Sequence, residues 1–111
     1  MATIIKKNRF AQIREKGTKQ IREALLAGPA TGSNKMTLRE IEIEPDGKTA
    51  GKAFVSPVIY FILDGKVVLS HNNGELDLLE QNNTVTLQKN EHHYLHNTSK
   101  TKTLVLMITS Q

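Results

Sequence analysis

Three of the four histidines lie in one short segment, Glu91–Asn97, which reads EHHYLHN. Imidazole is the commonest protein metal ligand and exchanges protons near neutral pH, so chemistry is to be sought here first. On a β-strand, alternate side chains share a face. If this segment is a strand, one face carries His93, Leu95 and Asn97, and the other carries His92, Tyr94 and His96.

His92 and His96 are a conceivable metal-binding pair, because they share one face of this strand. A protein metal site needs several ligands that converge on one point, and the neighbouring sequence offers no third ligand. We therefore favour a simpler interpretation, in which these two histidines are exposed and polar. His93 is then the core histidine, with its ring hydrogen-bonded.

Tyr60 and His93 are the second candidate for chemistry. Histidine titrates near neutral pH and a tyrosine hydroxyl can donate a proton, so the two could act as acid and base on a bound ligand. The alternative is that Tyr60 is a packed aromatic side chain whose hydroxyl is satisfied. Their separation in the sequence does not by itself bring them together.

Several catalytic classes lack their sequence signatures. The Gly-rich segment GPATGSN at 28–34 has no phosphate-loop lysine and no helix pattern after it. No G-x-S-x-G, H-E-x-x-H or paired-carboxylate motif occurs. The chain contains no cysteine, so disulfides and thiolate metal sites are excluded, which fits the cytoplasm.

The chain has 111 residues and a formal net charge of +4, and this charge is unevenly distributed. Residues 1–22 carry +6, whereas residues 23–111 carry −2. We do not expect a nucleic-acid partner, because the basic segment contains a single aromatic residue, Phe10. The only candidates for such contacts are Lys6, Lys7, Arg9, Arg14, Lys16, Lys19 and Arg22.

The elements that must position these residues are mostly strands. Residues 8–16 predict a short helix or arm, and residues 19–27 fit a helix or a strand equally well. From Met36 the apolar residues alternate, and Pro45-Asp46-Gly47 signals a turn that ends the first run. Short runs then recur at 58–63, 66–70, 75–79, 84–88, 92–97 and 103–109. This spacing predicts one all-β domain, a sandwich or barrel, with its core in residues 36–111. No apolar run is long enough to span a membrane.

Two motifs give the chain a family resemblance. The turn PDGKT at 45–49 precedes the strand VIYFILDGKVVL at 58–69, and VTLQKNEHHYLHNTS follows at 85–99. This layout resembles the cupin superfamily over nearly the whole chain. The resemblance implies a jelly-roll β-barrel, usually dimeric, that holds a metal or a small ligand inside. It places His93 at the family's metal-ligand position and Asn97 at its closing asparagine.

The chain departs from the family where the other metal ligands belong. The family's first motif contains two histidines and a glutamate, but this stretch reads AGKAFVSP, and Val58 stands at the glutamate position. One imidazole does not hold a divalent ion against water. We therefore expect a metal-free cupin without a cofactor.

The resemblance also assigns the faces of the strand at 58–63. Its inward residues would line a cavity together with the second motif, a set of Val58, Tyr60, Ile62, His93, Leu95 and Asn97. Its outward residues Ile59, Phe61 and Leu63 would form a homodimer interface. We expect a cytoplasmic homodimer that binds a small organic ligand or serves as a scaffold.

Two alternatives remain open. The first is a metal-independent sugar or keto-acid isomerase or epimerase that uses Tyr60 and His93 as acid and base. The second is a dimerisation domain like the nuclear cupin of centromere protein C, which residues 45–111 resemble.

Overall fold

The computed structural model describes residues 11–12, 17–28 and 35–110, and these form strands and connecting loops with no helix. The strands are β1 (Ala11–Gln12), β2 (Lys19–Ala27), β3 (Met36–Lys48), β4 (Val58–Asp64), β5 (Lys66–His71), β6 (Leu76–Glu80), β7 (Thr84–Leu87), β8 (His93–His96) and β9 (Thr103–Ser110). The all-β prediction is confirmed. No helix in the described ranges has the length and apolarity of a membrane span.

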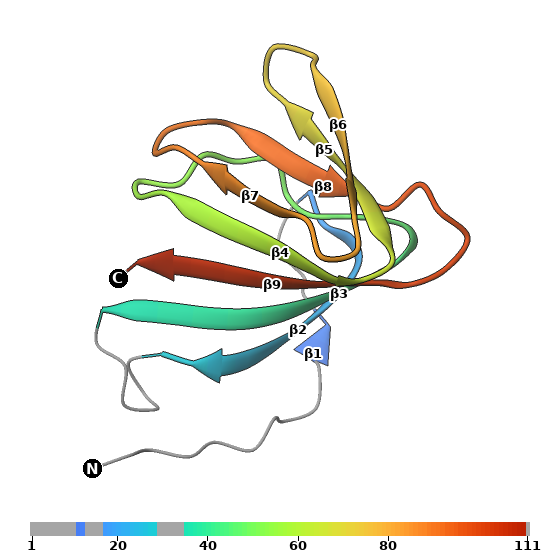
Figure 1. Ribbon diagram of the computed structural model, residues 1–111, viewed down its shortest axis with the longest axis horizontal. Helices are drawn as coiled ribbons and strands as arrows, with labels where there is room; N and C mark the ends of the chain where they lie inside the picture. Colours follow the sequence, from blue (N-terminus) through green and yellow to red (C-terminus); the bar gives the residue numbers. More distant parts are fainter. Residues whose placement is uncertain (1–10, 13–16, 29–34, 111) are drawn as a thin grey trace.

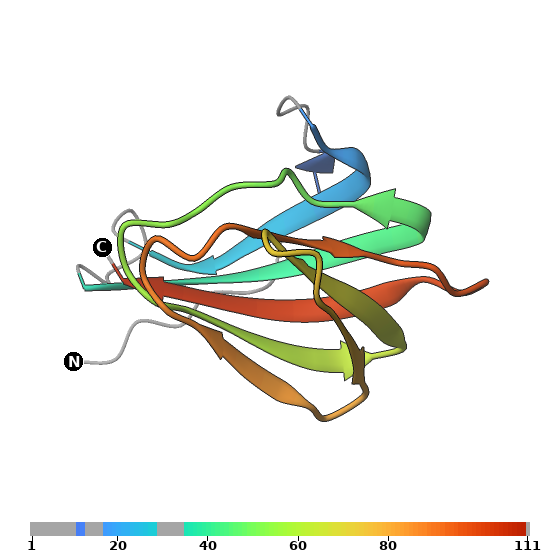
Figure 2. The same ribbon diagram turned by 90° about the horizontal axis from the view of Figure 1, so that it is seen from above.

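The strands form a nearly closed antiparallel barrel. Their order is β6-β5-β8-β3-β9-β4-β7, with β2 paired to β3 and β1 paired to β2. The two ends of this order meet at the turn after β6, where the backbones of Ile62 and Asn83 are hydrogen-bonded. Figure 1 shows the β5–β6 hairpin beside β8, and Figure 2 shows the strands curving around a single interior.

The sequence of residues 19–27 forms strand β2, which settles the choice between helix and strand. The expected helix over 8–16 is wrong at Ala11 and Gln12, because these residues pair with Glu23 and Arg22 of β2. The remainder of that helix, residues 8–10 and 13–16, lies outside the described residues.

Strand β3 does not end at Pro45-Asp46-Gly47 as the sequence predicts, but continues to Lys48. Asp46 has a positive φ of 65°, and this bend turns the strand from its pairing with β9 to a pairing with β8. A Cβ at Gly47 would lie 2.8 Å from the carbonyl oxygens of Gln20 and Glu44. The turn residues therefore bend one long strand across the barrel.

Strand β4 explains how the core is built. Its burial alternates, so Val58, Tyr60 and Ile62 are buried while Ile59 and Phe61 are half-buried on the outer side. Alternation of this kind is what the period of a strand produces when one face packs inward. The inward residues join a single apolar cluster with Ile41, Ile43, Val67, Leu69, Leu87, Leu95 and Val105.

Candidate functional site at the mouth of the barrel

The structure brings Tyr60 of β4 and His93 of β8 into direct contact. The Tyr60 hydroxyl oxygen lies 2.8 Å from Nε2 of His93, and the two rings meet edge to face. Nδ1 of His93 lies 3.0 Å from the backbone oxygen of Glu91. Both ring nitrogens of His93 therefore have hydrogen-bond partners within the protein.

The partners fix the direction of the hydrogen bonds. A backbone oxygen can only accept, so Nδ1 of His93 carries the proton and Nε2 accepts the hydrogen bond that the Tyr60 hydroxyl donates. Burial lowers the pKa of His93 and raises the pKa of Tyr60. Both groups are therefore neutral at pH 7.

Among the described residues, no acidic side chain is hydrogen-bonded to the His93 ring. Glu91 contacts it through its backbone oxygen, and Asp77 instead lies 2.8 Å from Nε2 of His71. The other ring neighbour of His93 is Phe54, at 5.8 Å between ring centroids. The acid–base role of Tyr60 and His93 thus lacks the carboxylate that usually makes a histidine a stronger base.

The surroundings of His93 do not fit a metal ion. The hydrogen-bond and ring contacts of its imidazole among the described residues are with a neutral tyrosine, a phenylalanine and a backbone oxygen, whereas divalent ions need several ionised or imidazole ligands. Within residues 11–12, 17–28 and 35–110, no three histidine, aspartate or glutamate side chains converge into a possible metal site.

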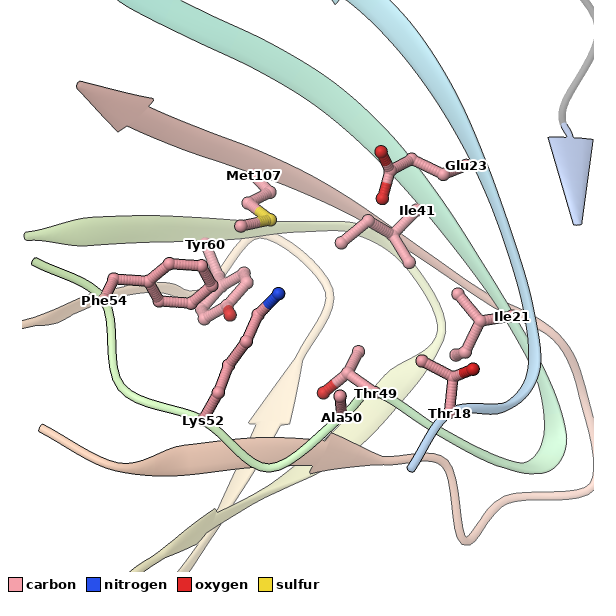
Figure 3. A pocket seen from close by; sticks show the side chains of 10 residues that line it. All are labelled: Thr18, Ile21, Glu23, Ile41, Thr49, Ala50, Lys52, Phe54, Tyr60 and Met107. Atoms are coloured by element: carbon pink, nitrogen blue, oxygen red, sulfur yellow. The ribbon is translucent and has the colours of Figure 1, made fainter. Parts of the chain in front are cut away.

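A small cavity lies beside Tyr60, with a volume of about 60 Å³ (Figure 3). Strands β2, β3, β4 and β9 contribute to it, together with the segment that follows β3. Its lining consists of Thr18, Ile21, Glu23, Ile41, Thr49, Ala50, Lys52, Phe54, Tyr60 and Met107.

Of the residues expected in a cavity, Tyr60 lines this one. Val58, Ile62 and Leu95 are almost completely buried and belong to the apolar core. Asn97 is also buried, and its amide donates to the backbone oxygens of Ile43 and Thr101. The side chains of these residues are engaged in packing or in hydrogen bonds. Their role in ligand binding stays a prediction.

A wider groove adjoins the cavity at the mouth of the barrel, with a volume of about 390 Å³. The groove and the cavity share the residues Glu23, Lys52, Phe54 and Met107. Lys52 and Phe54 belong to the stretch AGKAFVSP, which stands where the resembled family has its first metal motif. The sequence of this stretch carries no motif that marks Lys52 and Phe54 as site residues, and only the structure places them here.

Glu23, Arg39 and Lys52 are the charged side chains among the described residues that line the groove. Arg39 Nε lies 2.9 Å from a carboxylate oxygen of Glu23, and both side chains are about one-third exposed. Nζ of Lys52 lies 5.1 Å from the centroid of the Phe54 ring, within the range of a cation–π contact.

The two histidines on the outer face, His92 and His96, have different surroundings. His92 is exposed, and His96 Nε2 lies 3.0 Å from Asp46 Oδ1. Hydrogen bonds from Lys19 and then His96, reinforced by the charge of Lys19, lower the pKa of Asp46 to about 2. The structure gives His92 and His96 no common ligand-binding point among the described residues.

Two members of the basic segment are described, and both contact acids. Lys19 pairs with Asp46, and Arg22 pairs with Glu42 and Glu44. The others lie outside the described residues: Lys6, Lys7, Arg9, Arg14 and Lys16. A nucleic-acid surface on this segment stays untested.

The outward residues of β4 face an apolar neighbour strand. Ile59 is paired with Ile108 of β9, and Phe61 is paired with Leu106, all half-buried. Leu63 is also half-buried on this side. The placement is compatible with the dimer interface that the sequence predicts, and the dimer stays a prediction.

Comparisons with solved structures identify this architecture. The polyketide cyclase RemF from Streptomyces resistomycificus superposes with a TM-score of 0.85 at 18% identity, over 92% of this chain and 72% of that chain. A cupin-like protein from Thermotoga maritima gives a TM-score of 0.80 at 14% identity, over 99% and 82%. Drosophila melanogaster CENP-C, solved bound to CAL1, gives 0.72 at 15% identity, over 93% and 79%.

No protein-family model and no curated protein sequence matches the chain. At identities this low, the structural likeness speaks for the fold and not for the activity. The barrel, its strand order and these superpositions agree with the two sequence motifs. The chain has the cupin fold, a jelly-roll β-barrel.

Proposed function

We propose that this chain is a metal-free, homodimeric cupin that binds a small organic ligand at the mouth of its barrel. The observation that carries the proposal is the connected cavity and groove around Lys52, Phe54 and Met107. Ligand pockets combine an apolar lining with a few polar groups, and this depression has both. Binding is favoured over catalysis because both ring nitrogens of His93 are hydrogen-bonded to partners other than a carboxylate in the described part of the chain.

The hydrogen bonds of His93 support the metal-free part of the proposal. A metal at Nε2 would have to displace the Tyr60 hydroxyl, and only one imidazole would then hold the ion. Metal analysis of the purified protein, with and without added Mn, Fe and Zn, tests this. We expect far less than one equivalent. A full equivalent that is lost in His93→Ala would overturn the metal-free assignment.

The ligand site is tested by screening small organic molecules for a shift in the thermal unfolding midpoint. Ligands that stabilise the wild type should lose their effect in Phe54→Ala, which removes the wall shared by cavity and groove. Val85→Ala is the matched control, because Val85 also packs against the core but lies outside the lining of both spaces. Equal shifts in Phe54→Ala and the wild type would place the ligand elsewhere.

The homodimer is supported by the apolar outer surface of β4 and β9. We expect light scattering to give twice the monomer mass. Phe61→Arg should shift the protein to monomers, whereas Leu78→Arg should not. Leu78 is 54% exposed on β6, which is not one of the two strands of the proposed interface. A monomeric wild type would overturn this part of the proposal.

A dimeric scaffold without a ligand is the second candidate. It is favoured by the small volume of the inner cavity, about 60 Å³, which leaves the barrel largely filled by side chains. CENP-C is a cupin-fold protein that was solved bound to a protein partner. A stable dimer for which no ligand shifts the unfolding midpoint would favour the scaffold over the binding module.

A further inference from the structure

The two ends of the sheet order, β6 and β7, present different side chains. Among the described residues, β6 pairs with β5 alone and β7 pairs with β4 alone. The exposed residues of β7 are Thr84 and Thr86, whereas β6 exposes Leu76 by 66% and Leu78 by 54%. Natural proteins usually protect an open edge with charges, prolines or bulges, because such an edge pairs readily with other chains. The exposed leucines make β6 the less protected edge.

The backbone of β6 offers hydrogen-bonding groups at this edge. The N–H of His71 donates to the oxygen of Glu75 at 2.9 Å, so these residues form a hydrogen-bonded pair at the end of the β5–β6 hairpin. Such pairs alternate with non-hydrogen-bonded pairs along an antiparallel ladder. In the observed register, the N–H and C=O groups of Leu76 and Leu78 therefore point away from β5. The open stretch ends at Glu80, whose N–H donates to a side chain of the following turn.

The side chains of β6 show which strand would fit this edge. Leu76 and Leu78 lie on one face, and Glu75 and Asp77 lie on the other, because successive side chains of a strand alternate. Residues that face each other across two paired strands have their side chains on the same face and interact there. A complementary strand therefore carries apolar side chains at alternate positions and basic side chains between them.

The charge of the hairpin favours a basic strand over a second copy of β6. Residues 64–80 carry a net charge of −3 with histidine neutral, from the four acids Asp64, Glu75, Asp77 and Glu80 and the one base Lys66, whereas the whole chain carries +4. Lys66 lies opposite Glu80 in the register, and His71 Nε2 lies 2.8 Å from Asp77, so the cations of a partner would add to existing contacts. A second β6 would bring further acids to the edge, and like charges on paired strands are destabilising.

We infer that the open edge of β6 binds an extended segment of a partner protein in which apolar and basic residues alternate. The segment adds one strand to the sheet, with its backbone hydrogen-bonded to Leu76 and Leu78 and its apolar side chains covering these two leucines. Its lysines or arginines lie near Glu75 and Asp77. In binding of this kind, main-chain hydrogen bonds supply affinity and alternate side chains supply specificity. Figure 1 shows the turn of the hairpin extending beyond the neighbouring strands, where a partner can approach.

This interaction is independent of a ligand at the mouth of the barrel, because β6 contributes no residue to the cavity or the groove. Loss of one would therefore leave the other in place.

Three synthetic peptides test the edge by NMR titration of the full chain. The first alternates valine and lysine, the second has glutamate in place of lysine, and the third is the first with N-methyl groups on its valine nitrogens. The lysine peptide should bind about tenfold more tightly than the glutamate peptide, because several exposed ion pairs together contribute about this factor. Added salt should reduce this ratio. N-methylation should weaken binding by about tenfold or more, because it removes main-chain hydrogen bonds.

Substitutions connect the binding to the edge. Leu78→Thr should weaken binding of the lysine peptide about fivefold, because it removes apolar surface that the peptide covers. Leu25→Thr is the matched control, since Leu25 is an exposed leucine on β2. Glu75→Gln should reduce the preference for lysine over glutamate about twofold, whereas Thr86→Lys changes the net charge equally on β7 and should leave this preference nearly unchanged. All four positions are exposed, so the fold should survive.

The expected chemical-shift changes centre on β5 and β6. Equal binding of the lysine and glutamate peptides, or of the lysine peptide and its N-methylated form, would overturn the inference. Shift changes centred on β7 or on the mouth of the barrel, or no binding at all, would also overturn it. If the amides of Leu76 and Leu78 are protected from hydrogen exchange in the free protein at high concentration but not on dilution, a second copy occupies the edge and the basic partner is wrong.

Discussion

Removal of the Tyr60 hydroxyl is the sharpest test of the hydrogen-bond network inside the barrel. Tyr60→Phe keeps the ring that packs in the core and removes the group 2.8 Å from Nε2 of His93. His93 has only 2% of its surface exposed, so this nitrogen would be left without its donor in a buried position. The substitution should therefore cost stability without creating a large cavity.

Leaving a buried acceptor without a hydrogen bond destabilises a protein by about 1–3 kcal/mol, so we expect Tyr60→Phe to lower the free energy of unfolding by about 2 kcal/mol. For a domain of this size, that lowers the unfolding midpoint by about 8 °C, at about 4 °C per kcal/mol. The second substitution, His93→Phe, removes the orphaned acceptor. Because replacing both partners by apolar groups costs less than breaking the pair, Tyr60→Phe combined with His93→Phe should be more stable than the sum of the single effects predicts.

The assay is urea unfolding followed by circular dichroism, with all four members of the double-mutant cycle measured at pH 7.5. A change below about 0.5 kcal/mol in Tyr60→Phe, which is the usual size of a neutral surface substitution, would refute the reasoning. Additive effects in the double variant would show that Tyr60 and His93 do not interact. Nitrogen chemical shifts of His93 should independently show the proton on Nδ1.

Three further predictions concern pH, a turn and a buried amide. Because the pKa of His93 is lowered in the folded protein, its contribution to stability is complete above the unfolded-state pKa of 6.5 and is lost as the pH falls below 6.5. The pKa of His71 is raised, mainly by the hydrogen bond to Asp77. The contribution of His71 to stability is therefore present at low pH and is lost as the pH rises through this raised pKa. Asp77→Asn should therefore reduce stability at pH 5.5 more than at pH 8.5 in urea titrations, and equal losses would contradict this. Gly65→Ala should lower the free energy of unfolding by about 1–3 kcal/mol, because φ is 83° and a Cβ would lie 2.8 Å from Thr103 Oγ1. Gly74→Ala is the control and should cost less in the same assay, because Gly74 has a similar φ but open space around the added Cβ. Asn97→Ala should cost about 2–3 kcal/mol by calorimetry, since two carbonyl oxygens lose their donor, and a neutral effect would exclude the structural role of this amide.

The strands were predictable where the sequence alternates between apolar and polar residues. VIYFIL and the Asp64-Gly65 turn gave β4 and the start of β5 almost to the residue, because local composition alone favours them. The extension of β3 through Pro45-Asp46-Gly47 was not predictable in this way. Those residues favour a turn, and only the two neighbouring strands make them a bend in a longer strand.

The candidate site was only partly predictable. The sequence singled out Tyr60 and His93 by residue type, and the structure places them in contact. It did not indicate Lys52 and Phe54, because a lone lysine and a lone phenylalanine in a loop carry no periodic pattern. Their position depends on how the segment after β3 crosses the mouth, where the backbone of Lys52 is hydrogen-bonded to that of His93.

Strand β9 is the last of the described strands along the chain, but it lies inside the sheet order, between β3 and β4. During synthesis on the ribosome, these two strands therefore wait as open edges until residues 103–110 have emerged. Exposed edges of this kind pair readily with other chains. A polypeptide truncated before Thr103 would keep most of the core residues but would lack the strand that pairs with both β3 and β4. We therefore expect such fragments to aggregate or be degraded.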